Sequence, residues 1–327
     1  MTLDSKVEQR LWEIVEWGQF ALLLDILTPK PGNVHRYRDH PDTHILHFAA
    51  SISRLGYPLY NAAKWGYALR TVKNEPSQLG ILLKNATQAV MEPHGKNTLL
   101  GTNLVLVPLA AAAGVDIPET RPSVTRIRQH LSRILHATTV DDAVELVRTL
   151  QIASPGGAIP KTVGWTSQSQ AFDFQSPRTI GLIRREKYTL RDLQGLAAAY
   201  DAIAEEYTTD FSYTFETLYP QFNKALNHYQ HLDDAVLATY MWALSQRPDT
   251  FIQRKAGIDT ANKIMQEART LYKRLQKLPT TRWLKEIAPF EEALRAEGSR
   301  LNPGTTADLL SASIFLALLF GNIKTIL

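Results

Sequence analysis

Apolar residues recur at helical spacing along most of this chain, and no stretch shows the strict alternation of a half-buried strand. Near the N-terminus, Val7, Leu11 and Ile14 form such a helical face. The nearest strand candidate is LVLV at residues 104–107, but an alanine-rich, helix-forming segment follows it directly. The sequence therefore predicts an all-α fold.

The same periodicity predicts where the helices lie. The first helix is expected to begin at Ser5-x-x-Glu8, which has the pattern of a capping box. Further helices are expected at residues 43–68, 77–91, 102–114, 123–136, 140–150, 190–218, 232–245, 260–278 and 305–319.

The stretch at residues 151–190 interrupts this pattern, because it is rich in proline, glycine and serine. A loop of this length in a compact domain is usually a lid, a binding loop or a local insertion. The stretch could also divide two domains. We expect a single large helical domain over residues 1–327, with a long excursion at about residues 151–190.

Composition excludes several classes of function. The chain has 327 residues with a formal net charge of +4, and its basic residues form no block, so nucleic acid is not the expected partner. There is no cysteine, which excludes disulfides and thiol nucleophiles.

The most apolar run, LLSASIFLALLFG, is shorter than the roughly 20 residues that span a bilayer, so we expect a buried helix and no membrane partner. The charged N-terminus does not resemble a signal peptide, and the cytoplasm is the expected location.

Four polar or glycine-rich turns occur where apolar helices are expected to begin or end. They span residues 30–43, 95–103, 247–257 and 301–310. Free backbone N–H groups and the helix dipole make helix N-termini suitable for phosphate. Lys30, Arg254 and Lys255 would add positive charge. Together these turns predict an anion-binding site.

Acidic residues accompany these turns: Asp25, Asp42, Asp249 and Asp308. Carboxylates beside phosphates commonly hold Mg²⁺, which requires oxygen ligands. Four histidines lie between residues 35 and 47, but their spacing is irregular and no HExxH motif is present, so a transition-metal site is not expected.

Each polar residue also has a purely structural interpretation. Thr305-x-x-Asp308 resembles a capping box, Asp42 is an N-cap candidate, and Asn97-Thr98 has the chemistry of a cap. Three sets of charged residues are most simply interpreted as exposed to solvent. They are Lys30 in a loop, the Arg254–Lys255 pair on the surface, and Glu205, Glu206 and Asp210 on an exposed helix face.

Familiar nucleotide and hydrolase signatures are absent, including the P-loop, the dinucleotide-binding glycine motif and the nucleophile elbow. Residue chemistry alone therefore predicts a helical protein with several polar helix starts that are suited to an anion.

Five motifs in order resemble the triphosphoribosyl-dephospho-CoA synthase family, in the branch found in archaea and some bacteria. They are PKPGNVHR with a downstream D-T, N-T-x-x-G before an apolar helix, S-P-G-G, F-x-x-R-K-x-G and N-P-G-T-T-A-D-L. They extend from about residue 22 to residue 319. The resemblance implies an all-helical transferase that moves a triphosphoribosyl group from ATP to the ribose hydroxyl of 3′-dephospho-CoA and releases adenine.

The resemblance also implies a site. Catalysis would fall to Asp25, Asp42 and Asp308, with Mg²⁺ held by Asp42 and Asp308, although base and metal ligand are not separable among these aspartates. The motif residues that would line the nucleotide site are Lys30, Gly32, Asn33, His35, Asn97, Thr98, Gly101, Arg254, Lys255, Gly304, Thr305 and Thr306.

The chain departs from the family pattern in two motifs. Leu99 and Leu100 replace a histidine and a lysine of the second motif, and the first motif reads K-P-G-N-V-H instead of K-P-G-L-V-D. Two alternatives therefore stay open: a different ATP-using step in cofactor biosynthesis, or a non-catalytic nucleotide-binding protein. The expected partners are ATP and a small-molecule acceptor, with a homodimer as a further expectation.

Overall fold

The computed structural model describes residues 4–71, 76–117, 122–154 and 173–323. Within these ranges the regular structure is helical, and the β-pairing is confined to an isolated bridge between His35 and Arg38. The predicted all-α fold is confirmed. None of the helices in these ranges is long and apolar enough to cross a membrane.

The chain begins with long helices and ends with one. The elements are α1 Ser5–Leu27, α2 Ile45–Ala68, α3 Leu79–Met91, α4 Leu100–Val115, α5 Val124–His136, α6 Val140–Ala153, α8 Thr179–Glu186, α9 Leu190–Ala197, α10 Ala202–Thr208, the π-helix η1 Tyr213–Leu218, α11 Tyr219–Tyr229, α12 Leu232–Gln246, α13 Thr250–Ala256, α14 Ile258–Leu275, the 3₁₀ turn η2 Thr280–Arg282, α15 Trp283–Arg295 and α16 Gly304–Leu319.

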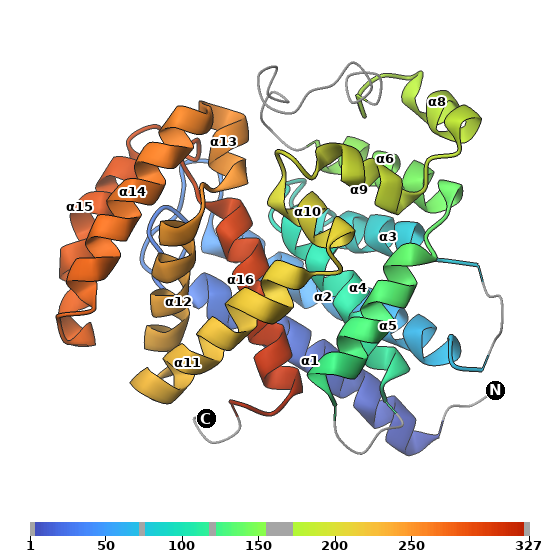
Figure 1. Cartoon of the computed structure of the whole chain (residues 1–327), viewed down its shortest axis with the longest axis horizontal. Helices are drawn as coiled ribbons and strands as arrows, with labels where there is room; N and C mark the ends of the chain where they lie inside the picture. The colour runs from blue at the N-terminus through green and yellow to red at the C-terminus, as the bar shows by residue number, and fades with distance from the viewer. Residues whose placement is uncertain (1–3, 72–75, 118–121, 155–172, 324–327) are drawn as a thin grey trace.

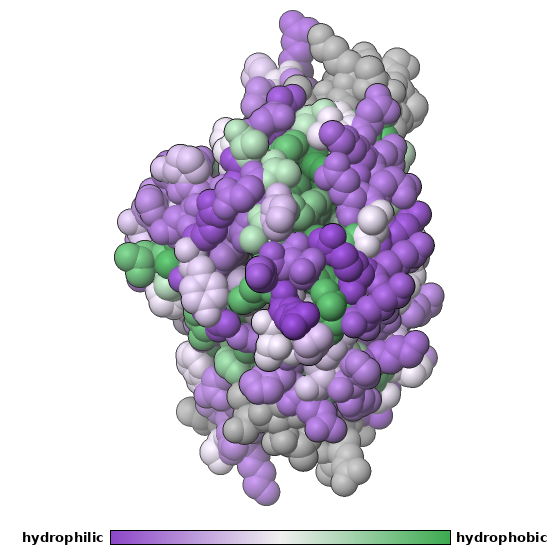
Figure 2. All heavy atoms as spheres, turned by 90° about the vertical axis from the view of Figure 1, so that its left-hand side faces the viewer, coloured by the Kyte–Doolittle hydropathy of each residue, from purple (hydrophilic) through white to green (hydrophobic). Residues whose placement is uncertain are grey.

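Helix α16 runs through the middle of the molecule, with α1, α4, α11 and α12 packed around it (Figure 1). The α13–α15 group lies on one side, and α3, α6, α8 and α9 lie on the other. α4 and α16 are apolar nearly all round, which is typical of helices in the core of a larger domain. The face that carries α13–α15 is mostly hydrophilic, with scattered hydrophobic groups (Figure 2).

Helices α2 and α4 cross at very short range. A Cβ on Gly66 would overlap the carbonyl oxygen of Ala111, and a Cβ on Gly114 would overlap that of Ala63. Small residues on both helices therefore let the two backbones touch. The LVLV segment lies inside α4, because the alanine-rich run continues the helix that the valines and leucines begin.

Most predicted helices are confirmed to within a few residues, but several expectations were wrong. The capping box at Ser5-x-x-Glu8 is absent, because Asp4 is the N-cap and its carboxylate accepts the Lys6 N–H. The predicted helix at residues 190–218 is divided into α9, α10 and the π-helix. Among the described residues, four α-helices were missed: α8, α11, α13 and α15.

The excursion expected at residues 151–190 is shorter than predicted. α6 continues to Ala153, and α8 lies inside the stretch, where Ile183 packs against Ala143, Val144 and Val147 of α6. The remaining part of the stretch, residues 155–172, lies outside the described residues. The lid and the single-domain organisation stay predictions.

Candidate active site

Lys30 is the most deeply buried charged residue of the first polar turn. Its side chain is fully buried and forms an ion pair with Asp25 at the C-terminal end of α1. Burial lowers the pKa of Lys30, against the opposing attraction of Asp25 and Asp308. Burial also raises the pKa of Asp25, although Lys30 counteracts this. The interpretation of Lys30 as a solvated loop residue is therefore wrong.

Gly32 joins the first turn to the fourth. It has φ = +83°, which favours glycine, and a Cβ there would lie 2.7 Å from Pro303 Cδ and 2.9 Å from Leu294 Cδ1. The K-P-G-N turn therefore packs against the N-P-G turn that precedes α16. Two segments separated by some 270 residues of sequence meet at this point.

Asn33 and His35 hold the first turn onto α12 and α15. The Asn33 amide donates to the Tyr240 hydroxyl at 2.8 Å, and that hydroxyl donates to the Pro31 carbonyl at 2.7 Å. His35 Nε2 lies 2.8 Å from Glu291 Oε1. Both side chains are buried. They are engaged within the protein and position the turn, which sequence reasoning did not anticipate.

Asp308 faces α4 across the centre of the molecule. Its Oδ1 accepts a 2.5 Å hydrogen bond from the Thr102 hydroxyl, and a Cβ on Gly101 would overlap its Oδ2. Burial raises the pKa of Asp308 to about 7, and the charges of Asp25 and Asp249 act in the same direction. The capping interpretation of Thr305-x-x-Asp308 is wrong, because Pro303 is the N-cap of α16 and no side chain caps it.

Asp249 joins the third and fourth turns. Its Oδ1 accepts the N–H groups of Phe251 and Ile252 at the start of α13, at 2.9 and 3.1 Å. Its Oδ2 accepts the amide and the hydroxyl of Thr306 in α16, both at 2.7 Å. This buried carboxylate therefore bridges two helix N-termini. Sequence reasoning counted Asp249 among the acids of the site but did not anticipate this structural role.

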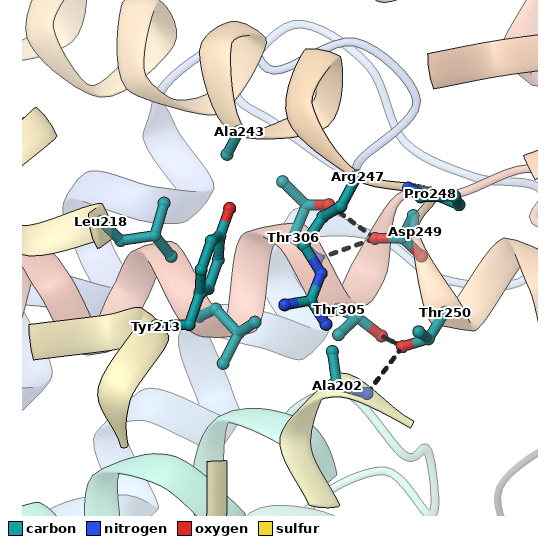
Figure 3. A pocket seen from close by; sticks show the side chains of 11 residues that line it. Ala202, Tyr213, Leu218, Ala243, Arg247, Pro248, Asp249, Thr250, Thr305 and Thr306 are labelled. Carbon is teal, nitrogen blue, oxygen red and sulfur yellow. Dashed lines mark hydrogen bonds between the residues drawn. The ribbon is translucent and has the colours of Figure 1, made fainter. Parts of the chain in front are cut away.

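The fourth turn lines a small cavity together with the third. Thr305 and Thr250 share a hydroxyl–hydroxyl contact at 3.1 Å, and the Thr250 hydroxyl also accepts the Ala202 N–H (Figure 3). The cavity measures about 10 Å³, which is room for roughly one water molecule. Arg247 extends into it beside the two threonines, and Tyr213 lines its other side (Figure 3). Neither residue was predicted for the site.

Arg254 and Lys255 have different surroundings. Arg254 forms an ion pair with Asp201, the N-cap of α10. Lys255 lies 4.2 Å from the centroid of the Phe251 ring, and burial lowers its pKa while Asp42 opposes the shift. Both cations are only partly exposed, and they are not a simple surface pair.

Asp42 is exposed, and its charge acts on Lys255 and His40. It is not an N-cap: α2 begins at Ile45, whose N–H donates to the Asp39 carboxylate at 2.7 Å. The charges that act on Asp308 are instead those of Asp25, Asp249 and Lys30. The three predicted catalytic aspartates therefore divide into Asp25, which is buried, Asp308, which is partly exposed, and Asp42 on the surface.

The second turn has the predicted cap. The Asn97 carboxamide oxygen accepts the Leu100 N–H at 3.2 Å at the start of α4. The Thr98 hydroxyl contacts the Ser51 hydroxyl of α2 at 2.7 Å. Leu99 is buried in the hydrophobic core, as is Leu100. The two leucines of this motif therefore contribute packing.

Glu206 is not on a solvated face, contrary to expectation. It is buried, and its carboxylate accepts the N–H groups of Tyr213 and Thr214 at 3.1 and 3.0 Å. Burial raises the pKa of Glu206 to about 7. The residue thus caps the π-helix, which is a structural role.

Comparison with known proteins identifies the family of the chain. The sequence model of the family described as ATP:dephospho-CoA triphosphoribosyl transferase matches residues 11–325. The fold is similar to the crystal structure of a protein from Archaeoglobus fulgidus assigned as a triphosphoribosyl-dephospho-CoA synthase, at 22% identity and a TM-score of 0.59. The alignment covers 84% of this chain and 99% of that one. A search of curated proteins returned no match.

Proposed function

The chain belongs to the family of ATP:dephospho-CoA triphosphoribosyl transferases, and on this premise we propose that Asp308 is the catalytic base of the transfer. The reaction moves a triphosphoribosyl group from ATP to dephospho-CoA. The observation that carries the assignment is the position of Asp308. This carboxylate is only partly exposed, has a pKa of about 7, and lies where α4 meets α16, beside the Asp25–Lys30 pair.

A base with a pKa near the working pH removes a proton most effectively. Ionised Asp308 takes the proton of the acceptor hydroxyl of dephospho-CoA as that oxygen bonds to the anomeric carbon of the ATP ribose. The bond from this carbon to the adenine nitrogen breaks, and its electron pair leaves with adenine. The triphosphate stays on the transferred sugar.

The transition state of such a displacement carries positive charge on the sugar ring, as in glycoside hydrolysis. Buried carboxylates stabilise that charge most strongly where water is excluded. Among the predicted catalytic aspartates, Asp25 is buried and Asp308 is only partly exposed, and Lys30 balances only part of their charge. The net negative charge of this region suits a cationic transition state.

The phosphates need cations, and three are near the first and third turns: Lys30, Arg254 and Lys255. We propose that the triphosphate lies toward Lys255 and the start of α16, where Gly304 adds no side chain beside the Phe251 ring over which Lys255 lies. Thr305 and Thr306 offer fewer hydrogen-bond donors to phosphate than the sequence predicted, because the Thr306 amide and hydroxyl already donate to Asp249.

Magnesium is proposed to enter with ATP. Within the described ranges no three His, Cys, Asp or Glu side chains are placed to hold an ion together. This is compatible with a phosphate-bound Mg²⁺, which keeps several waters and takes only one or two carboxylates from a protein. Asp42, exposed beside Lys255, would be that ligand, and the ion would neutralise phosphate charge when bound. A homodimer and a cytoplasmic location also stay predictions.

The Asp308 carboxylate also favours an enzyme over a non-catalytic binding protein. Asp308 caps no helix, and its pKa indicates that burial disfavours its charge. A purely structural position would be better served by a neutral side chain. Glu206 has a similar pKa, but its carboxylate caps the π-helix, whereas Asp308 caps no helix and so lacks that structural explanation.

Mass spectrometry of the purified protein with Mg-ATP and 3′-dephospho-CoA tests the proposal. We expect free adenine and a dephospho-CoA product that is heavier by one triphosphoribosyl group. Asp308→Asn should lower turnover by about 10²- to 10⁴-fold, the usual contribution of a general base. Asp141→Asn, an exposed acid in the first turn of α6, should not. Adenine without the CoA product would indicate a different acceptor, and no adenine at all would contradict the transfer.

A further inference from the structure

The first turn of α4 has an unusual composition. The helix reads LGTNLVLVPLAAAAGV, and its only polar side chains are Thr102 and Asn103. Both are buried. A polar side chain inside such an apolar helix costs free energy unless it is hydrogen-bonded, so each needs a reason to be there. For Thr102 the structure supplies that reason directly.

Thr102 and Gly101 contact the Asp308 carboxylate from the same side. The Thr102 hydroxyl donates to Oδ1 at 2.5 Å, a short bond of the charge-assisted kind. Gly101 lies against Oδ2, where a Cβ would overlap the oxygen. Threonine is branched at Cβ, which restricts rotation about χ1 and so fixes the direction of its hydroxyl. The two α4 residues therefore fix both the position and the plane of the carboxylate.

We infer that Thr102 is a positioning residue for Asp308 and fixes the orientation in which that carboxylate takes the acceptor proton. The inference rests on the function proposed above. Because Oδ1 is held by Thr102, Oδ2 is the oxygen that accepts the proton. The hydroxyl also forms a link between α4 and α16, which come from distant parts of the sequence.

A role limited to linking the helices would affect stability alone, whereas positioning affects turnover. Thr102→Val keeps the shape and removes the hydroxyl, and Thr102→Ser keeps the hydroxyl. Thr149→Val is the matched control, because Thr149 is an equally buried threonine whose hydroxyl donates to the Glu145 carbonyl within α6. The measurements are kcat, KM for ATP, KM for dephospho-CoA, and the melting temperature of each variant.

We expect Thr102→Val to lower kcat by about 10- to 100-fold, the scale of a small misplacement of a catalytic group, with both KM values within about twofold of the wild type. Thr102→Ser should recover most of kcat, and Thr149→Val should leave it unchanged. If Thr102→Val does not fold, Thr102→Ala with Thr102→Ser gives the same comparison.

Two results would overturn the inference: full kcat in Thr102→Val, or a Thr102→Ser enzyme as slow as Thr102→Val. Failure of the proposed function looks different, because the wild-type protein would then form no triphosphoribosyl product. If the wild type is active and Asp308→Asn is not, while Thr102→Val keeps full turnover, only the role of Thr102 is wrong.

Discussion

At the scale of single residues, Asp308 should make the protein less stable as the solution becomes more alkaline. Its pKa is about 7 in the folded chain, whereas an aspartate in an unfolded chain titrates near 3.9. Between these values the folded chain retains a proton that the unfolded chain has lost. Stability from this group is therefore fully present below about pH 4 and is lost as pH rises through about 7.

Asp308→Asn removes this titration. We expect the variant to gain stability relative to the wild type as pH rises from 5 to 8, because the wild type must ionise a poorly solvated carboxyl over that range. Glu206 has a similar pKa but is present in both proteins, so its effect cancels. Chemical denaturation at pH 5 and pH 8 measures the difference. If the difference in unfolding free energy between the two proteins does not change with pH, ionisation of Asp308 does not destabilise the folded chain.

The sequence identified several site residues whose roles required the structure. Lys30 was predicted as a cation of the site, but its complete burial against Tyr240 of α12 and Asp25 of α1 is a long-range contact that no local pattern encodes. Asp42 was equally plausible as an N-cap, yet Asp39 accepts the first amide of α2, because the turn brings it back to the helix start. Thr102 gave only a weak signal, a polar residue in an apolar run.

At the scale of helices, the sequence predicts long apolar segments well and short or charged ones poorly. α4 and α16 were found because their apolar runs exceed ten residues. α13 has only seven residues, which is too short for a periodic signal. α15 has apolar residues at helical spacing, Trp283, Ile287, Phe290 and Leu294, but Pro289 lies inside it and argues against a helix. The division of residues 190–218 reflects tertiary contacts, since buried Glu206 caps the π-helix that follows α10.

The close crossing of α2 and α4 gives a prediction at this scale. Gly66→Ala should lower the free energy of unfolding by about 1–3 kcal/mol, because the new methyl overlaps the Ala111 backbone and the helices must separate. Gly181→Ala is the control, since it lies in α8 with open space around a Cβ. That change should stabilise by roughly 0.5–1 kcal/mol through helix propensity alone. Denaturant titration measures both, and equal effects would contradict a tight crossing.

At the scale of the whole molecule, the site is built from parts that lie far apart in the sequence. Asp25 and Lys30 come from the first tenth of the chain, Thr102 from α4, and Asp308 from the last helix. Periodicity predicts each helix but not which helix ends meet. The order of the motifs indicated a common site through family resemblance, whereas the contacts among them come only from the packing around α16.

The position of the first turn depends on α15, and through it on the half of the molecule that carries α12–α15. Arg295 of α15 donates to the carbonyls of Asn33 and Asp39 and forms an ion pair with Glu291 at 2.8 Å, and Glu291 also contacts His35. Only 8% of the Arg295 side chain is exposed. One guanidinium thus connects both ends of the turn that contains Gly32 to a helix near the end of the chain.

Arg295→Lys should therefore weaken ATP binding more than it slows the chemical step. A lysine ammonium lacks the planar fork that reaches three acceptors at once, so the turn loses part of its support and KM for ATP should rise about tenfold, with kcat changed little. Arg274→Lys is the matched control, because the exposed Arg274 of α14 forms an ion pair with Glu286 of α15, the helix that carries Arg295. Steady-state kinetics of both variants give the KM for ATP and kcat that test this prediction. If Arg295→Lys raises KM for ATP no more than Arg274→Lys does, the turn is held by its buried Lys30, Asn33 and His35 contacts alone, and α15 does not set the geometry of the nucleotide site.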